Sequence, residues 1–72
     1  MVKVREEYRK RLKNVLNANH YEALMSRVGY YHDFMDYLND LTATYLDPET
    51  WEATDEALEL EDLFALIARD NK

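Results

Sequence analysis

The chain has 72 residues, of which 47% are apolar, and a formal net charge of −6 at neutral pH. This length allows one folded domain, and the apolar content excludes an intrinsically disordered chain. Because cysteine is absent, a disulfide framework and a thiolate metal site are excluded. The sequence contains one Gly and one Pro, and so few turn residues favour long helices over many short strands.

The opening segment is predicted to form an amphipathic helix over residues 3–16. Its apolar side chains recur at spacings of three and four residues, which is typical of a helix with one buried face. We expect a turn to follow, because Asn17 and Asn19 tolerate the left-handed backbone that ends helices. The apolar stripe consists of Val4, Tyr8, Leu12, Val15 and Leu16.

A heptad seam predicts one long helix over residues 20–46. A helix of that length would extend for roughly 40 Å, so the first helix could not cover it. The surplus apolar surface would meet the third helix or a second copy of the chain. Gly29 lies opposite the seam and marks either a kink or a close contact. The seam runs through Tyr21, Leu24, Val28, Tyr31, Met35, Leu38, Thr42 and Tyr45.

Asp47 and Pro48 predict the start of a third helix over residues 48–70, with Trp51 anchoring its first turn. Thr54 is an alternative start, since threonine is also a good cap, and the helix would then be broken near residue 54. The expected fold is all-α: a small three-helix bundle, or a long helical hairpin with an added N-terminal helix. The core stripe of the third helix consists of Ala57, Leu60, Leu63, Phe64 and Ile67.

Charge is segregated along the chain. Residues 1–13 hold six basic and two acidic side chains, a net of +4, whereas residues 14–72 hold three basic and thirteen acidic ones, a net of −10. One interpretation is that the first helix lies against the acidic helices and neutralises part of them. Because +4 cannot balance −10, an exposed acidic face should remain.

An acidic surface with neighbouring tyrosines is the first candidate binding site. Asp33, Asp36 and Asp40 recur at three and four residues, which places them together on the outward face of a helix. Carboxylates seek Arg or Lys on a partner, and Tyr offers contact area at little entropy cost. The alternative is a solvated helix face. The candidate partner-binding residues are Tyr30, Asp33, Asp36, Tyr37, Asp40, Glu49, Glu52, Asp55, Glu56 and Glu59.

The basic first helix is a secondary candidate contact surface. It could approach nucleic acid, but the surrounding negative charge predicts poor phosphate affinity unless the acids face away. We therefore expect neither direct nucleic-acid binding nor membrane binding, and a protein with a basic surface is the expected partner. The residues of this secondary surface are Arg5, Arg9, Lys10, Arg11 and Lys13.

Catalytic and metal chemistry are not indicated. His32 and Asp36 are four residues apart, but two ligands do not make a metal site. Ser26 is the single serine and has no adjacent histidine to activate it. We expect no enzymatic activity, no cofactor and no metal. The first residues lack the apolar segment of a signal peptide, so a cytoplasmic protein is expected.

Three function classes remain. The first is a small acidic inhibitor of the phage or mobile-element type, anti-CRISPR-like or a DNA mimic, that blocks the nucleic-acid-binding surface of a partner protein. This analogy is one of composition, not of motif. The second is a dimeric regulatory protein that binds nucleic acid through the basic N-terminal helix. The third is an antitoxin, immunity or assembly protein that pairs through the heptad seam. We favour the first.

Overall fold

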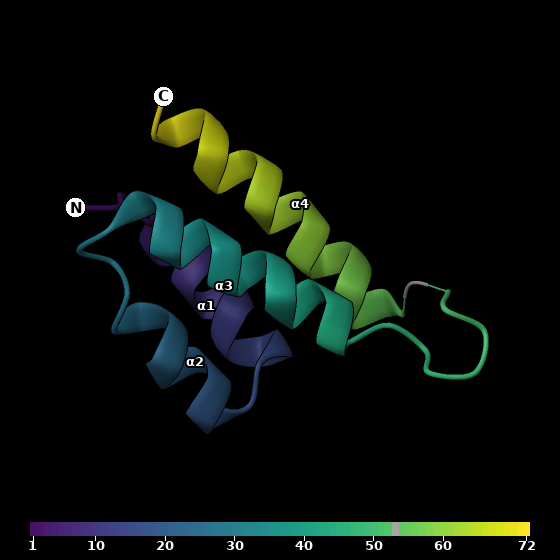
Figure 1. Ribbon diagram of the computed structural model, residues 1–72. Coiled ribbons are helices and arrows are strands. Elements are labelled where there is room, and N and C mark those ends of the chain that lie inside the picture. Colours follow the sequence, from purple (N-terminus) through teal and green to yellow (C-terminus); the bar gives the residue numbers. More distant parts are fainter. Residues whose placement is uncertain (53) are drawn as a thin grey trace.

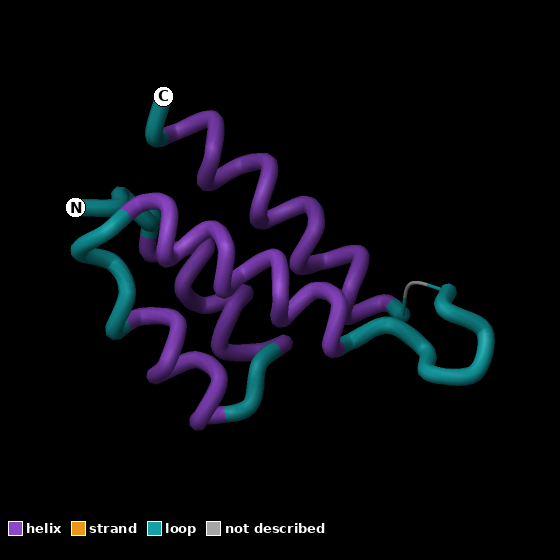
Figure 2. Tube along the Cα trace, in the orientation of Figure 1, coloured by secondary structure: helices purple, strands orange, loops and turns teal. Residues whose placement is uncertain are grey.

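The computed structural model describes residues 1–52 and 54–72, and these residues form four helices (Figure 1). The expected all-α fold is confirmed, with one helix more than predicted. In the tube view of Figure 2, the most extended connection is the one between the third and fourth helices. No described helix is long and apolar enough to cross a membrane. The helices are α1 (Glu6–Val15), α2 (Ala18–Met25), α3 (Tyr31–Thr44) and α4 (Asp55–Asp70).

The four helices occupy the corners of a small bundle. α1 packs on α2 and α4, and α3 packs on the same two helices, most extensively on α4. α1 and α3 do not pack on each other, so they lie at opposite corners, and Figure 1 shows α1 behind α3. The solvent-facing sides of α1 and α3 therefore point away from each other.

Every helix contributes at least one fully buried apolar side chain to a common core. Burying a large apolar side chain stabilises a fold by roughly 1.5–3 kcal/mol, so this core supplies most of the favourable free energy. The predicted stripes of the first and third helices are buried as expected, apart from Val15 and Phe64, which are half-buried. The largest fully buried side chains are Leu12, Leu24, Phe34, Leu38, Leu60, Leu63 and Ile67.

The prediction of a single helix over residues 20–46 is wrong, because the chain turns at residues 26–29 between α2 and α3. A continuing helix would pair the Ala23 carbonyl with the Arg27 amide. That carbonyl instead accepts hydrogen bonds from the Ser26 hydroxyl and the Arg27 guanidinium. The Val28 carbonyl accepts from the Val2 amide at 2.6 Å. A straight helix of roughly 40 Å would also exceed the longest dimension of the molecule, 36 Å.

Gly29 is not the steric cause of this turn. Its φ is not positive, and a Cβ atom built on it would meet nothing within 4 Å. Seam residues on both sides of the turn are buried within the single chain, as Leu24, Met35 and Leu38 show. Folding back thus covers much of the seam that was expected to be left for a second copy.

The prediction of one helix starting at residue 48 is also wrong. The alternative was a separate helix starting at Thr54 after a short one. Its start at Thr54 is confirmed, but the described residues 48–52 form no short helix. The Asp47 carboxylate accepts from the Glu49 amide at 2.9 Å and so forms a tight local turn. The Thr54 hydroxyl caps α4 by accepting from the Ala57 amide at 3.1 Å. Trp51 does not anchor the helix, since its side chain is 74% exposed. Residue 53 of the predicted helix lies outside the described residues.

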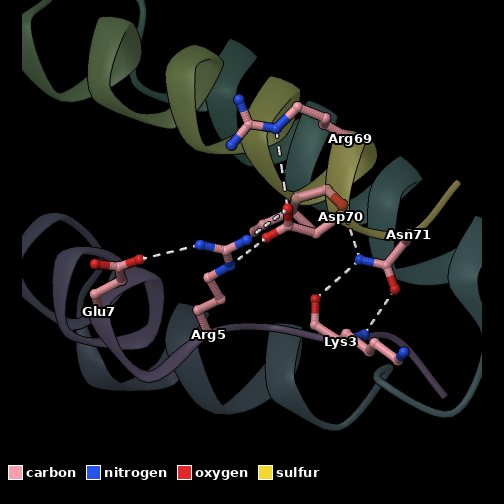
Figure 3. Close-up of polar contacts among 7 residues, drawn as sticks. Lys3, Arg5, Glu7, Arg69, Asp70 and Asn71 are labelled. Atoms are coloured by element: carbon pink, nitrogen blue, oxygen red, sulfur yellow. Dashed lines mark hydrogen bonds and ion pairs between the residues drawn. The ribbon is translucent and has the colours of Figure 1, made fainter.

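The first helix starts at Glu6 rather than at residue 3, because the preceding residues bind elsewhere in the fold. Figure 3 shows Lys3 paired with Asn71, whose side chain accepts from the Lys3 amide at 2.7 Å and donates to its carbonyl at 2.9 Å. In the same view Arg5 Nε lies 2.8 Å from Asp70 Oδ2. These contacts tie the extended N-terminal segment to the end of α4.

Candidate functional site

The outward face of α3 carries the acidic row, which we define as Asp33, Asp36 and Asp40. All three are exposed, and the opposite side of the same helix buries Phe34 and Leu38. Within the described chain, none of the three carboxylates forms an ion pair. The row is therefore available to an external cation.

Only one of the three carboxylates in the acidic row stabilises α3. Carboxylates stabilise the start of a helix through its macrodipole, which accounts for Asp33 in the first turn. Asp40 stands just before the last turn, where the same dipole disfavours negative charge. Asp36 and Asp40 are also a like-charge pair four residues apart, which costs about 0.2–0.5 kcal/mol. Two of the three charges thus oppose helix formation.

The two predicted tyrosines have different environments. Tyr30 precedes α3, is 73% exposed and leaves its ring open to solvent. Tyr37 is half-buried, and the Arg27 guanidinium lies over its ring, 4.1 Å from the ring centroid. A stacked arginine is worth about 0.5–2 kcal/mol, so Tyr37 contributes mainly to the packing of α3 against the α2–α3 connection. Tyr30 remains as an aromatic contact beside the acidic row.

The loop between α3 and α4 carries further candidates. Glu49 and Glu52 are exposed there, and Asp55 and Glu56 are exposed in the first turn of α4. The macrodipole accounts for the last two without any partner. Trp51 has a left-handed backbone (φ 59°) and an exposed side chain, and composition alone did not mark it as a surface residue. Figure 1 shows this loop extending from the bundle beyond the end of α3.

Glu59 was a candidate partner-binding residue, but its carboxylate is bound within the chain. Its carboxylate accepts from Arg11 Nε, and Arg11 Nη2 donates to Asp62 Oδ2 at 2.8 Å. These hydrogen bonds, with Glu59 foremost, raise the pKa of Arg11 above its usual value. The expectation that the first helix neutralises part of the acidic helices is therefore met at α4. Sequence spacing could not reveal this pair, because Arg11 lies 48 positions before Glu59.

The basic side chains of residues 5–13 have two different roles. Arg5 and Arg11 bind carboxylates of α4, and the attraction of Asp70 raises the pKa of Arg5. Arg9, Lys10 and Lys13 are exposed and form no ion pair within the described chain. Their charge thus remains on the outer side of α1.

Other polar groups form local contacts. His20 Nδ1 lies 3.2 Å from the Tyr45 hydroxyl, and the two rings meet edge to face. His32 and Asp36 are both exposed. Among the described residues, no three His, Cys, Asp or Glu side chains are grouped so that they could hold a metal ion.

Neither a protein-family model, nor a curated protein, nor a solved structure matches this chain. The indications of function therefore come from the two charged surfaces.

Proposed function

We propose that this protein is a non-enzymatic binding module whose acidic row on α3 docks on a basic protein surface. The surface it occupies is one that the partner uses to hold nucleic acid, so that binding inhibits the partner. Such an action needs exposed carboxylates in a fixed array, without catalytic groups. The array is held by a helix whose other side is anchored in the core through Phe34 and Leu38.

The observation that carries this proposal is that two of the three carboxylates in the acidic row oppose helix stability and that none of the three has a cation within the described chain. Such a charge arrangement is retained at a cost of a few tenths of a kcal/mol. A basic partner surface would remove that cost and add charge-assisted hydrogen bonds. The exposed aromatic rings of Tyr30 and Trp51 are of the type that supplies apolar anchor contacts in interfaces.

The charge density of the acidic row is closer to one strand of DNA than to a duplex. Asp33 and Asp40 are seven residues apart, which is about 10 Å of helix. The three charges span two intervals that average about 5 Å along the helix, which is wider than the 3.4 Å per charge of one strand and much wider than the 1.7 Å of a duplex. The row would therefore replace one strand edge on the partner.

The test compares three immobilised proteins: the wild type, the variant Asp33→Asn/Asp36→Asn/Asp40→Asn, and a control with the same change in charge. Glu7→Gln/Glu56→Gln/Glu61→Gln is a suitable control, because these exposed acids lie on α1 and α4 rather than on α3. Nuclease-treated lysate of the source organism or its host is passed over each column. Bound proteins are eluted with salt or displaced with duplex DNA.

The expected result is that wild type and control retain the same nucleic-acid-binding protein, which salt releases and duplex DNA displaces. The α3 variant should lose about tenfold or more of that retention. Equal retention on all three columns would refute the role of the acidic row. A captured protein that DNA does not displace would refute the nucleic-acid-binding surface as the target, and so would a wild-type column that retains nothing.

A further inference from the structure

The outer side of α1 is hollowed along its length by three adjoining depressions, which we call the α1 groove. The central depression, about 500 Å³, lies between α1 and Tyr21 of α2. A second shares Val4 and Arg9 with it and continues to the N-terminal segment. A third shares Lys13 and Tyr21 and continues toward the α1–α2 connection. Because neighbouring depressions share residues, the three form one continuous groove.

The α1 groove is lined with unneutralised positive charge. Five basic side chains line it against two acidic ones, Glu6 and Glu22. Of the five, Arg5 is held by Asp70, and the other four form no ion pair within the described chain. A concave site with one sign of charge concentrates ligands of the opposite sign. The five bases are Lys3, Arg5, Arg9, Lys10 and Lys13.

Inside the groove the five bases outnumber Glu6 and Glu22, and two other groups of acids either lie at the opposite corner or are neutralised. The acidic row lies on α3 at the opposite corner, in a molecule whose shorter dimensions are 24 and 21 Å. At physiological salt the Debye length is about 8 Å, so little of that repulsion reaches α1. Glu59 and Asp62, which do face α1, are bound by Arg11. Positive charge therefore predominates in the α1 groove.

We propose that the α1 groove binds single-stranded nucleic acid, with Arg9, Lys10 and Lys13 on its phosphates and the Tyr21 ring against a base. Tyr21 is half-buried against the core, and the Lys13 ammonium lies over its ring, 5.3 Å from the ring centre. A bound base would take the place of that ammonium on the ring while Lys13 moves to a phosphate. This pairing of cation and ring is how proteins hold unpaired bases without reading sequence. A duplex keeps its base faces stacked and cannot use the ring. The proposal concerns a different corner from the acidic row and does not depend on the function proposed above.

The test is fluorescence anisotropy with a labelled oligothymidylate of about 15 nucleotides. We expect wild-type protein to bind at about 20 mM salt, and the logarithm of its affinity to fall with log salt at a slope of about −2. That slope follows from three phosphate contacts at about 0.7 each for a single strand. A duplex of the same length should bind more weakly.

Two matched pairs of variants locate the site. Arg9→Gln/Lys13→Gln should weaken binding by about tenfold or more and reduce the salt slope to about −0.7. Arg69→Gln/Lys72→Gln removes the same two kinds of cation outside the groove and should stay within about twofold of wild type. Tyr21→Leu should weaken binding several-fold and Tyr21→Phe should not, because stacking needs the ring and not the hydroxyl. Thermal melting of each variant checks that it is folded.

Three results would overturn the proposal: no anisotropy change with wild type at about 20 mM salt, equal losses in the two charge variants, or duplex binding as tight as single-strand binding. The α3 variant Asp33→Asn/Asp36→Asn/Asp40→Asn should bind the oligonucleotide at least as tightly as wild type, because the Debye length at about 20 mM salt is about 20 Å and the acidic row then repels the ligand. This last measurement separates the groove from the acidic row, so failure of either proposal leaves the other standing.

Discussion

α3 and α4 both present carboxylates at helical spacing, but the two sets have different roles. Glu59 and Asp62 on α4 face α1 and bind Arg11. Asp33, Asp36 and Asp40 on α3 lie at the corner opposite α1 and have no cation within the described chain. The carboxylates of α4 thus help to hold two helices together, whereas the carboxylates of α3 are exposed to solvent. Whether a charge is structural or available depends on which helix is its neighbour.

The basic segment repeats this division over two residues. Arg11 reaches the carboxylates of α4, whereas Arg9 lines the α1 groove. Two residues that are two positions apart on a helix point in directions about 200° apart. Arg9 and Arg11 therefore face different neighbours. The basic run is therefore not a single surface.

The largest expected effect on stability comes from removing a core contact of α3. Phe34→Ala should lower the free energy of unfolding by about 3–5 kcal/mol, because Phe34 is fully buried and its loss leaves a cavity. The control Leu58→Ala on α4 should change it by less than about 0.5 kcal/mol, since Leu58 is exposed. Urea denaturation followed by circular dichroism measures both. Similar losses would mean that the packing described for α3 is wrong.

A smaller effect is expected at the α1–α4 contact. Arg11→Gln should lower the free energy of unfolding by about 1 kcal/mol, because Glu59 and Asp62 would then face each other without a cation. Arg9→Gln removes the same group where no carboxylate binds it and should have little effect on stability. Thermal unfolding at low salt and at about 1 M NaCl checks this, since salt should remove most of the difference. Equal melting temperatures for the two variants at low salt would contradict the structural role of Arg11.

The smallest effects distinguish positions within the acidic row. Asp40→Asn should raise the free energy of unfolding by a few tenths of a kcal/mol, because it removes repulsion from Asp36 and an unfavourable charge near the end of α3. Asp33→Asn should lower it by a similar amount, since that charge favours the first turn. Melting curves at low salt resolve the opposite signs. A loss of stability on Asp40→Asn would indicate a cation contact that the structure does not contain.

The positions that face the core were predictable from the sequence, but the course of the chain between them was not. Spacings of three and four residues identified Leu12, Leu38, Leu60 and Ile67 as buried. The same spacing continues across residues 26–29, so it predicted one helix where there are two. The turn depends in part on the Val2 amide, which binds the Val28 carbonyl from 26 positions away. No local pattern contains that contact.

For the candidate surfaces, exposure was predictable from the sequence, but the contacts between helices were not. The spacing of Asp33, Asp36 and Asp40 placed them on one outward face, and all three are exposed. Glu59 shares their residue class and helical setting, yet Arg11 binds it. Tyr21 was assigned to the heptad seam, and only the packing of α1 beside α2 places it in a basic groove.

By itself, the sequence determined that the chain is helical, which faces of its helices are apolar, and that positive charge gathers in the first thirteen residues and negative charge after them. These properties follow from the 3.6-residue period and from composition, and both are local. The tertiary structure decided where the chain turns, which corner each helix occupies, and therefore which charges neutralise one another. Those outcomes depend on contacts such as Arg11 with Glu59, 48 residues apart, whose energy exists only once the core has brought the helices together.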